Sequence, residues 1–151
     1  MKPSIVERHE VVQIATLLGV AIDAGLSLVA ALESVIPRAK GPLSSKFSKL
    51  LVGLNMGGNL YDELAQLRAE EKRPVLDELV VKLQVSLQFG TPLVEQLSML
   101  VGTNRSLIAA EQLAIAAKKE NLMLLPLVFL ILPITVVFAL FPSMQYLNLN
   151  Q

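Results

Sequence analysis

The C-terminal part of the chain carries no charged side chain: positions 121 to 151 contain no Asp, Glu, Lys or Arg. Within it, Leu122 to Leu140 is an apolar run that only two prolines and one threonine interrupt. At 1.5 Å per helical residue the run is about 28 Å long, close to the hydrocarbon thickness of a bilayer. It therefore predicts a transmembrane helix at residues 121–142. A buried C-terminal helix of a soluble protein is the alternative, but such helices rarely run this long without a charge.

Basic residues flank this run on one side only. Lys118 and Lys119 precede it, Arg105 lies further upstream, and no basic residue follows it. An excess of Lys and Arg marks the cytoplasmic flank of a membrane helix. We therefore expect residues 1–120 to form a cytoplasmic domain at a bacterial inner membrane or archaeal cell membrane, and residues 143–151 to form a short extracytoplasmic tail.

The rest of the composition argues against several classes of function. The 13 basic and 13 acidic residues balance, and no basic run exceeds two residues, so nothing indicates nucleic-acid binding. Cysteine is absent, and His9 is the sole histidine. The pair Gly57–Gly58 lacks the Gly-Lys-Ser/Thr of a phosphate-binding loop. We expect a protein that is not an enzyme, with no catalytic residue, no cofactor and no metal.

Apolar residues recur with helical spacing through most of positions 1–120, and no segment alternates with the period of a strand. The expected helices are 4–24, 27–38, 42–56, 59–71, 74–89 and 91–101, with a seventh that starts near Thr103 or Asn104 and continues through the membrane. Short connections make neighbouring helices antiparallel. The expected fold class is all-α: an antiparallel up-and-down bundle of about six helices followed by one C-terminal transmembrane helix. A second span at Val11–Leu32 is the alternative, which the central Asp23 disfavours.

A short motif, Gly-x-x-Leu-x-x-x-Leu, occurs three times, beginning at Gly25, Gly57 and Gly90. Glycine ends a helix readily because it reaches the left-handed backbone conformation without steric cost. The residues that favour an N-cap and follow within two positions are Ser27, Asn59 and Thr91. Each motif therefore predicts the end of one helix and the start of the next.

The order and spacing of these segments resemble a known family. The residues that carry the resemblance are Asp23–Val35 (DAGLSLVAALESV), Phe89–Leu97 (FGTPLVEQL) and Ala110–Pro142, within roughly residues 11–142. They resemble the type II secretion system F domain family, the inner-membrane platform proteins of type II secretion and type IV pilus machines. Among these, the chain looks most similar to the platform proteins of tight-adherence (Flp-type) pili.

The resemblance implies a non-enzymatic platform that links a cytosolic ATPase to pilin or pseudopilin subunits leaving the membrane. It also implies contact with other platform subunits in a homo- or hetero-oligomer. Family members usually carry further transmembrane helices, so we expect this chain to be a piece, a split partner or a reduced variant. A tail-anchored helical adaptor for another cytosolic partner is the alternative. A membrane enzyme or transporter subunit is disfavoured because the span has no ionisable residue.

Acidic residues near the glycine motifs are candidate contacts for a partner. They are Asp23, Glu33, Glu63 and Glu95. A partner ATPase could dock there through complementary charge, whereas helix capping and solubility are the alternative for each residue. A fifth candidate, Glu111, lies in an apolar, Ala-rich helix upstream of the span. We expect it to pair with Arg105 or Lys118, or to face a polar interface, because burial without a partner is costly.

Two prolines interrupt the predicted span. Pro126 and Pro133 are seven residues apart and therefore lie nearly on one helix face. Each removes a backbone donor and bends the helix. We expect a bent helix, whose kink either serves only packing or makes the helix line a groove for a pilin transmembrane segment.

Overall fold

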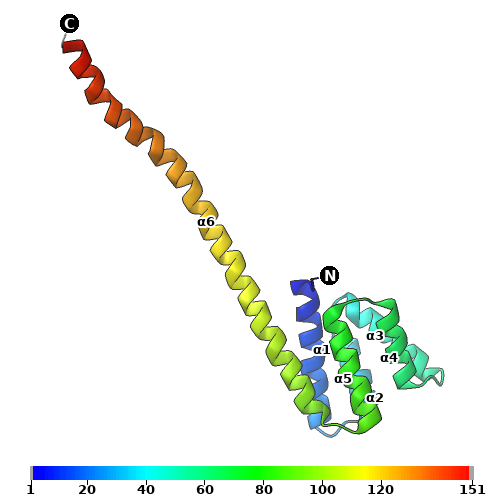
Figure 1. The fold of residues 1–151 in the computed structure, drawn as a ribbon. Coiled ribbons are helices and arrows are strands. Elements are labelled where there is room, and N and C mark those ends of the chain that lie inside the picture. Colours follow the sequence, from blue (N-terminus) through cyan, green and yellow to red (C-terminus); the bar gives the residue numbers. More distant parts are fainter. Residues whose placement is uncertain (1, 150–151) are drawn as a thin grey trace. The chain divides into compact units, whose positions relative to one another are not determined.

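The computed structural model describes residues 2–149 (Figure 1). In this range the chain forms helices and no strand, so the predicted all-α class is confirmed. The elements are α1 (Ile5–Asp23), α2 (Leu28–Val35), the short 3-10 helix η1 (Ile36–Arg38), α3 (Pro42–Asn55), α4 (Leu60–Glu70), α5 (Pro74–Phe89) and α6 (Leu93–Leu149). They divide into an N-terminal unit, Met1–Ala109, and a C-terminal unit, Ala110–Gln151. Asn150 and Gln151, the end of the predicted tail, lie outside the described residues.

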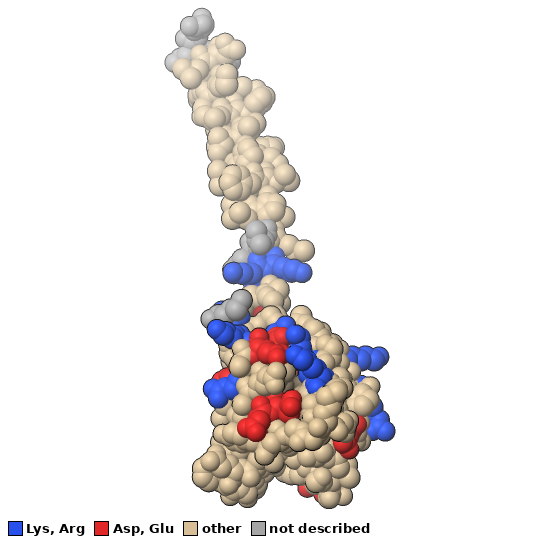
Figure 2. All heavy atoms as spheres, turned by 90° about the vertical axis from the view of Figure 1, so that its right-hand side faces the viewer, with Lys and Arg blue, Asp and Glu red and all other residues tan. Residues whose placement is uncertain are grey.

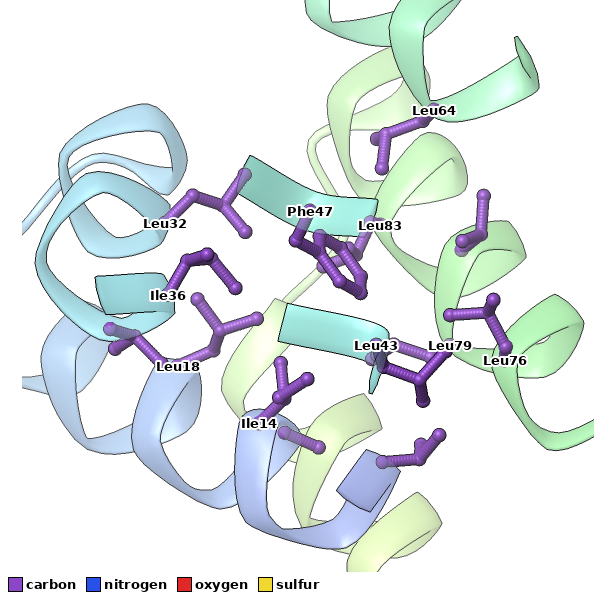
Figure 3. Packing of buried hydrophobic residues seen from close by; sticks show 14 of the residues in the cluster. Ile14, Leu18, Leu32, Ile36, Leu43, Phe47, Leu64, Leu76, Leu79 and Leu83 are labelled. Carbon is purple, nitrogen blue, oxygen red and sulfur yellow. The ribbon is translucent and has the colours of Figure 1, made fainter. Parts of the chain in front are cut away.

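The N-terminal unit is the predicted up-and-down bundle. Successive helices run in opposite directions (Figure 1); α1 packs against α2 and α5, and α4 packs against α3 and α5. Figure 3 shows Phe47 of α3 in the middle of the core, with Leu32 of α2 on one side and Leu79 of α5 on the other. All three side chains are fully buried. Burying one such side chain stabilises a fold by about 1.5–3 kcal/mol, so apolar contacts between helices hold the bundle together.

The three glycine motifs form the turns at one end of this bundle. The backbone φ angles of Gly25, Gly57 and Gly90 are +99°, +95° and +63°, in the region that only glycine enters without steric cost. After Gly25 and Gly57, the next backbone N–H donates to a carbonyl five residues back, which is the Schellman arrangement. These turns follow α1, α3 and α5, which run in the same direction (Figure 1). We call this end of the unit, at residues 24–27, 56–59 and 90–92, the glycine end.

The opposite end holds the start of α1 and the two other turns, at residues 39–41 and 71–73. There α3 begins at Pro42 and α5 begins at Pro74. Proline suits the first helical position because its missing N–H would have no helical partner there. We call this the proline end.

The helix starts differ from the predictions at two places. Ser27 and Asn59 are N-caps, since their side chains accept from the backbone N–H groups of Ala30 and Tyr61. Thr91 is not, because α6 begins at Leu93 and the Thr91 hydroxyl instead accepts from the side-chain amide of Gln96, at 2.9 Å.

The predicted break near Thr103 is also wrong, because α6 continues through it. The side chain of Asn104, expected to help start a seventh helix, donates back to the carbonyl of Leu100 at 2.9 Å and leaves the backbone helical. Gly102 lies within α6 and does not end the helix. The sixth and seventh predicted helices are therefore one helix.

The C-terminal unit is the continuation of α6. Within residues 2–149, Leu125–Asn148 is the one stretch of helix long and apolar enough to cross a membrane, with a mean hydropathy of 2.5. It overlaps the predicted span and begins and ends later. The helix runs through Pro126, Pro133 and a third proline, Pro142. The hydroxyl of Thr135 donates to the carbonyl of Ile131 at 2.8 Å, so this polar side chain is satisfied within the helix.

Candidate functional site: the two ends of the bundle

Two buried carboxylates of α1 cap two other helices at the proline end. An oxygen of Glu10 accepts from the backbone N–H of Leu43 at 3.2 Å, and an oxygen of Glu7 accepts from that of Val75 at 3.1 Å. Leu43 and Val75 are the second residues of α3 and α5. The residues before these helices, Gly41 and Arg73, provide no side-chain cap. The acids of α1 therefore satisfy N–H groups that helices α3 and α5 leave open.

The same turn of α1 is also tied to α6. The guanidinium of Arg8 donates from Nη1 to Oδ1 of Asn104 at 3.0 Å, and both residues are buried. Residues 7, 8 and 10 thus contact the starts of α3 and α5 and the first part of α6 within one unit. None of these three residues was among the predicted site residues. The available signal was the pair of helix starts, Gly-Pro and Arg-Pro, that lack a capping side chain of their own.

Ion pairs join the turns and helices near the proline end. Lys46 bonds Glu71 at 2.8 Å and Lys49 bonds Glu70 at 3.0 Å, while Arg68 pairs with Asp77. The hydrogen bond from Lys46 lowers the pKa of the Glu71 carboxyl below its ordinary value. Figure 2 shows acidic and basic side chains beside one another on this face of the unit. Exposed pairs of this kind contribute about 0–1 kcal/mol each, so they adjust the surface charge more than the stability.

The glycine end has a different surface. Large apolar side chains stand exposed beside its three turns: Leu26 is 42%, Met56 is 84% and Phe89 is 69% exposed. The lower end of the unit in Figure 2, where these turns lie, shows no Lys or Arg sphere. Exposed apolar residues with a polar rim are typical of a surface that contacts another protein.

The structure brings three of the predicted interface acids to this end. Asp23 is the last residue of α1, Glu63 lies in the first turn of α4, and Glu95 lies in the first turn of α6. The carboxylate of Glu63 lies over the turn itself, since a Cβ added at Gly58 would lie 2.6 Å from one of its oxygens. Asp23 and Glu95 are exposed. The alternative role of Glu63, a favourable charge at a helix N-terminus, is also consistent with its position.

Of the other two predicted interface acids, one belongs to each unit. Glu33 is exposed on α2, in the part of the helix that approaches η1. Glu111 is half-buried on α6 and belongs to the C-terminal unit. Within the N-terminal unit, the structure therefore groups Asp23, Glu63 and Glu95 and leaves Glu33 outside that group.

Two hollows among the described residues of the N-terminal unit differ from a typical small-molecule site, one in size and the other in its openness. A groove of about 270 Å³ between α1 and α6 is lined by Gly19, Leu97 and the charged residues Asp23 and Arg105. Ligand pockets usually enclose about 300–1,000 Å³. A larger hollow of about 830 Å³ beside α4 and α5 is open and lined by Arg68, Lys72 and Arg73. Among residues 2–149, no three His, Asp or Glu side chains come together as metal ligands would.

Comparison with known proteins identifies the family. The family model of the type II secretion system (T2SS) protein F matches residues 14–141, which include most of the bundle and most of the apolar helix. No curated protein and no solved structure matches the chain. Proteins of the matched family are structural platform components of type II secretion and type IV pilus machines. The chain, with its glycine-punctuated helical bundle and apolar C-terminal helix, therefore belongs to the type II secretion system protein F family.

Proposed function

We propose that this protein is an inner-membrane platform subunit that couples a cytosolic ATPase to the assembly of pilin or pseudopilin subunits. The observation that carries the proposal is the family match over residues 14–141, because it includes both the bundle and the apolar helix. Tight-adherence pilus assembly is the system we favour, on the resemblance of the segments around Gly25 and Gly90.

The distribution of basic residues supports one orientation in the membrane. Lys118 and Lys119 precede the candidate span Leu125–Asn148, and no Lys or Arg follows it. The positive-inside rule then assigns the N-terminal unit to the cytoplasm and the C-terminus to the extracytoplasmic side. A cytosolic ATPase would have access to the bundle in this orientation.

The glycine end is the surface that we assign to the ATPase. It presents Met56 and Phe89 to solvent, next to the carboxylates of Asp23, Glu63 and Glu95. An exposed aromatic or Met side chain supplies apolar contact area, and the acids select a partner with basic residues. These side chains come from α1, α4, α5, α6 and the turn after α3, so force applied there would act on most of the bundle.

The apolar helix is the surface that we assign to pilin subunits and to other platform subunits. Phe129 and Phe138 are 75% and 77% exposed within the C-terminal unit. Pro126 and Pro133 each remove one backbone hydrogen bond from the helix, and the freed carbonyls need partners inside a bilayer. Neighbouring transmembrane helices can provide those partners, whether they come from pilins or from further copies of the platform.

Copurification tests this function. The tagged chain is extracted from its native membranes in mild detergent, and the proteins that accompany it are identified by mass spectrometry. We expect a secretion-type ATPase and a pilin or pseudopilin. Recovery of an intact, membrane-bound chain with neither would contradict the platform role and favour the tail-anchored adaptor.

Two matched variants test the assignment of the glycine end. Phe89→Ser removes an apolar side chain that is 69% exposed at the glycine end, and Val6→Ser removes one that is 64% exposed at the proline end. Both changes should leave the fold intact, because neither side chain belongs to the core. We expect Phe89→Ser to reduce ATPase recovery and Val6→Ser to leave it unchanged. Equal recovery with both variants would contradict docking at the glycine end.

A further inference from the structure

The charges of the N-terminal unit are divided between its two ends. The three glycine turns lie within runs 9–37, 50–67 and 83–104, which contain no Lys or Arg. The half of the unit that holds the glycine end carries the acids Asp23, Asp62, Glu63 and Glu95. The bases of the unit all lie outside those runs: Lys2, Arg8, Arg38, Lys40, Lys46, Lys49, Arg68, Lys72, Arg73, Lys82 and Arg105. One half is therefore acidic, and the other has an excess of bases.

The basic excess is accessible at the proline end. Arg38 and Lys40 flank the turn before α3, Lys72 lies in the turn before α5, and Lys2 precedes α1; all four are exposed. The acids nearby are largely engaged, because Glu70, Glu71 and Asp77 already pair with Lys49, Lys46 and Arg68. Lys72 also lines the open hollow of about 830 Å³ beside α4 and α5. Among the described residues, these four cations of the proline end form no ion pair with an acid.

We propose that the proline end binds the anionic lipid headgroups of the bilayer in which the chain is anchored. The chain itself supplies the reason for this partner, since α6 contains the candidate span Leu125–Asn148. Tethering raises the local concentration of headgroups around the unit. Exposed Lys and Arg next to a membrane are attracted by the negative surface potential of its cytoplasmic leaflet. The proposal rests on the membrane anchoring assigned above.

The acidic glycine end is repelled by anionic headgroups. The sixteen residues of α5 connect the two ends, and at 1.5 Å per residue they are about 24 Å long. This exceeds the Debye length of about 8 Å at physiological ionic strength. With the proline end on the lipid, the acids of the glycine end are therefore beyond the range of strong repulsion. Met56 and Phe89 then face away from the bilayer, where a cytosolic protein can reach them.

Single-cysteine fluorescence tests this arrangement in the full chain. The chain has no cysteine, so one introduced thiol is labelled uniquely. Ala69→Cys places the label near the proline end and Met56→Cys places it at the glycine end; both positions are exposed. Each labelled chain is inserted into lipid nanodiscs that contain nitroxide-headgroup lipid as quencher. The nanodiscs are made with either phosphatidylglycerol or only phosphatidylcholine.

We expect severalfold stronger quenching at Ala69→Cys than at Met56→Cys in the anionic nanodiscs. This difference should fall in phosphatidylcholine and in about 1 M salt, where the Debye length is about 3 Å. Equal quenching at both positions, or a difference that is the same in both lipids, would overturn lipid binding by the proline end. A chain that does not enter nanodiscs would overturn the membrane anchoring as well. Failure of the anchoring is therefore distinguished from failure of lipid binding by the proline end.

A pair of charge variants provides a matched control. Lys40→Gln with Lys72→Gln removes two positive charges from the proline end, and Asn55→Glu with Gln88→Glu adds two negative charges near the glycine end. All four positions are exposed, and both double variants change the net charge equally. We expect only the first to reduce the quenching at Ala69→Cys. Equal reductions would mean that net charge, and not the proline end, determines the effect.

Discussion

Removing one carboxylate of α1 should loosen the start of one distant helix and leave the other in place. Glu10→Ala deletes the acceptor of the Leu43 N–H, and Leu43 is fully buried. Leaving a buried donor without a partner costs about 1–3 kcal/mol, and the loss of a capping side chain costs about 0.5–2 kcal/mol. Both ranges are large compared with a typical domain stability of about 5–15 kcal/mol.

Hydrogen exchange measures this loss locally. Glu10→Ala should speed exchange of peptides from the start of α3 by about tenfold for each 1.4 kcal/mol lost. Glu7→Ala should do the same at the start of α5, because Glu7 accepts from Val75. Glu10→Gln keeps a neutral oxygen acceptor and should recover most of the protection. The exposed carboxylate Glu33 serves as the control, and Glu33→Ala should change neither helix start.

Uniform behaviour of the two variants would contradict capping by Glu7 and Glu10. If Glu7→Ala and Glu10→Ala raised exchange equally across the whole bundle, the two acids would contribute to general stability and not to particular helix ends. Exchange rates equal to those of Glu33→Ala would also contradict capping. They would mean that water or another group satisfies the Leu43 and Val75 amides. The second helix start thus acts as an internal reference in each experiment.

Three further predictions follow from other parts of the chain. Gly57→Ala forces a side chain into a backbone with φ of +95° and should destabilise the unit by about 1–3 kcal/mol in urea unfolding, whereas Gly102→Ala within α6 should stabilise it by about 0.5–1 kcal/mol. The lowered pKa of Glu71 means that its pairing stabilises the fold above the ordinary glutamate pKa and is lost as pH falls through the lowered value. The urea midpoints of wild type and Glu71→Gln should therefore converge below about pH 4. Glu111→Leu should reduce copurification with other machine subunits more than Glu70→Leu, and equal recovery would remove any special role for Glu111.

The helices were predictable because local signals agree with the packing. Apolar spacing indicated each helix, and Gly25, Gly57 and Gly90 marked the ends of three of them correctly. Ser27 is an N-cap as predicted, since its side chain reaches a backbone N–H three residues on. Thr91 has the same chemistry, but its hydroxyl bonds Gln96 instead. Local propensity identifies candidate caps, and competition with other side chains decides which of them cap.

The arrangement of the polar residues was less predictable. The bond between Glu7 and Val75 joins positions 68 residues apart, so no local pattern contains it. The continuity of α6 past Gly102 has a similar cause, because Asn104 is engaged by Arg8, which is 96 residues away in the sequence. The proposed interface acids were selected for their closeness to glycine in the sequence. Three of the residues chosen in this way, Asp23, Glu63 and Glu95, lie at one end of the bundle. They do so because every second turn of an up-and-down bundle lies at the same end.

The capping of α3 and α5 by α1 also has a consequence for synthesis on the ribosome. The chain emerges from its N-terminus, so Glu7 and Glu10 are already present when the residues of α3 appear, and again when those of α5 appear. The first N–H groups of each later helix can therefore bond to a carboxylate of α1 that has already been synthesised. Residues 5–10 would then cap α3 and α5 in the order in which these helices form. In a nascent chain without them, the first N–H groups of both helices would lack these carboxylate partners.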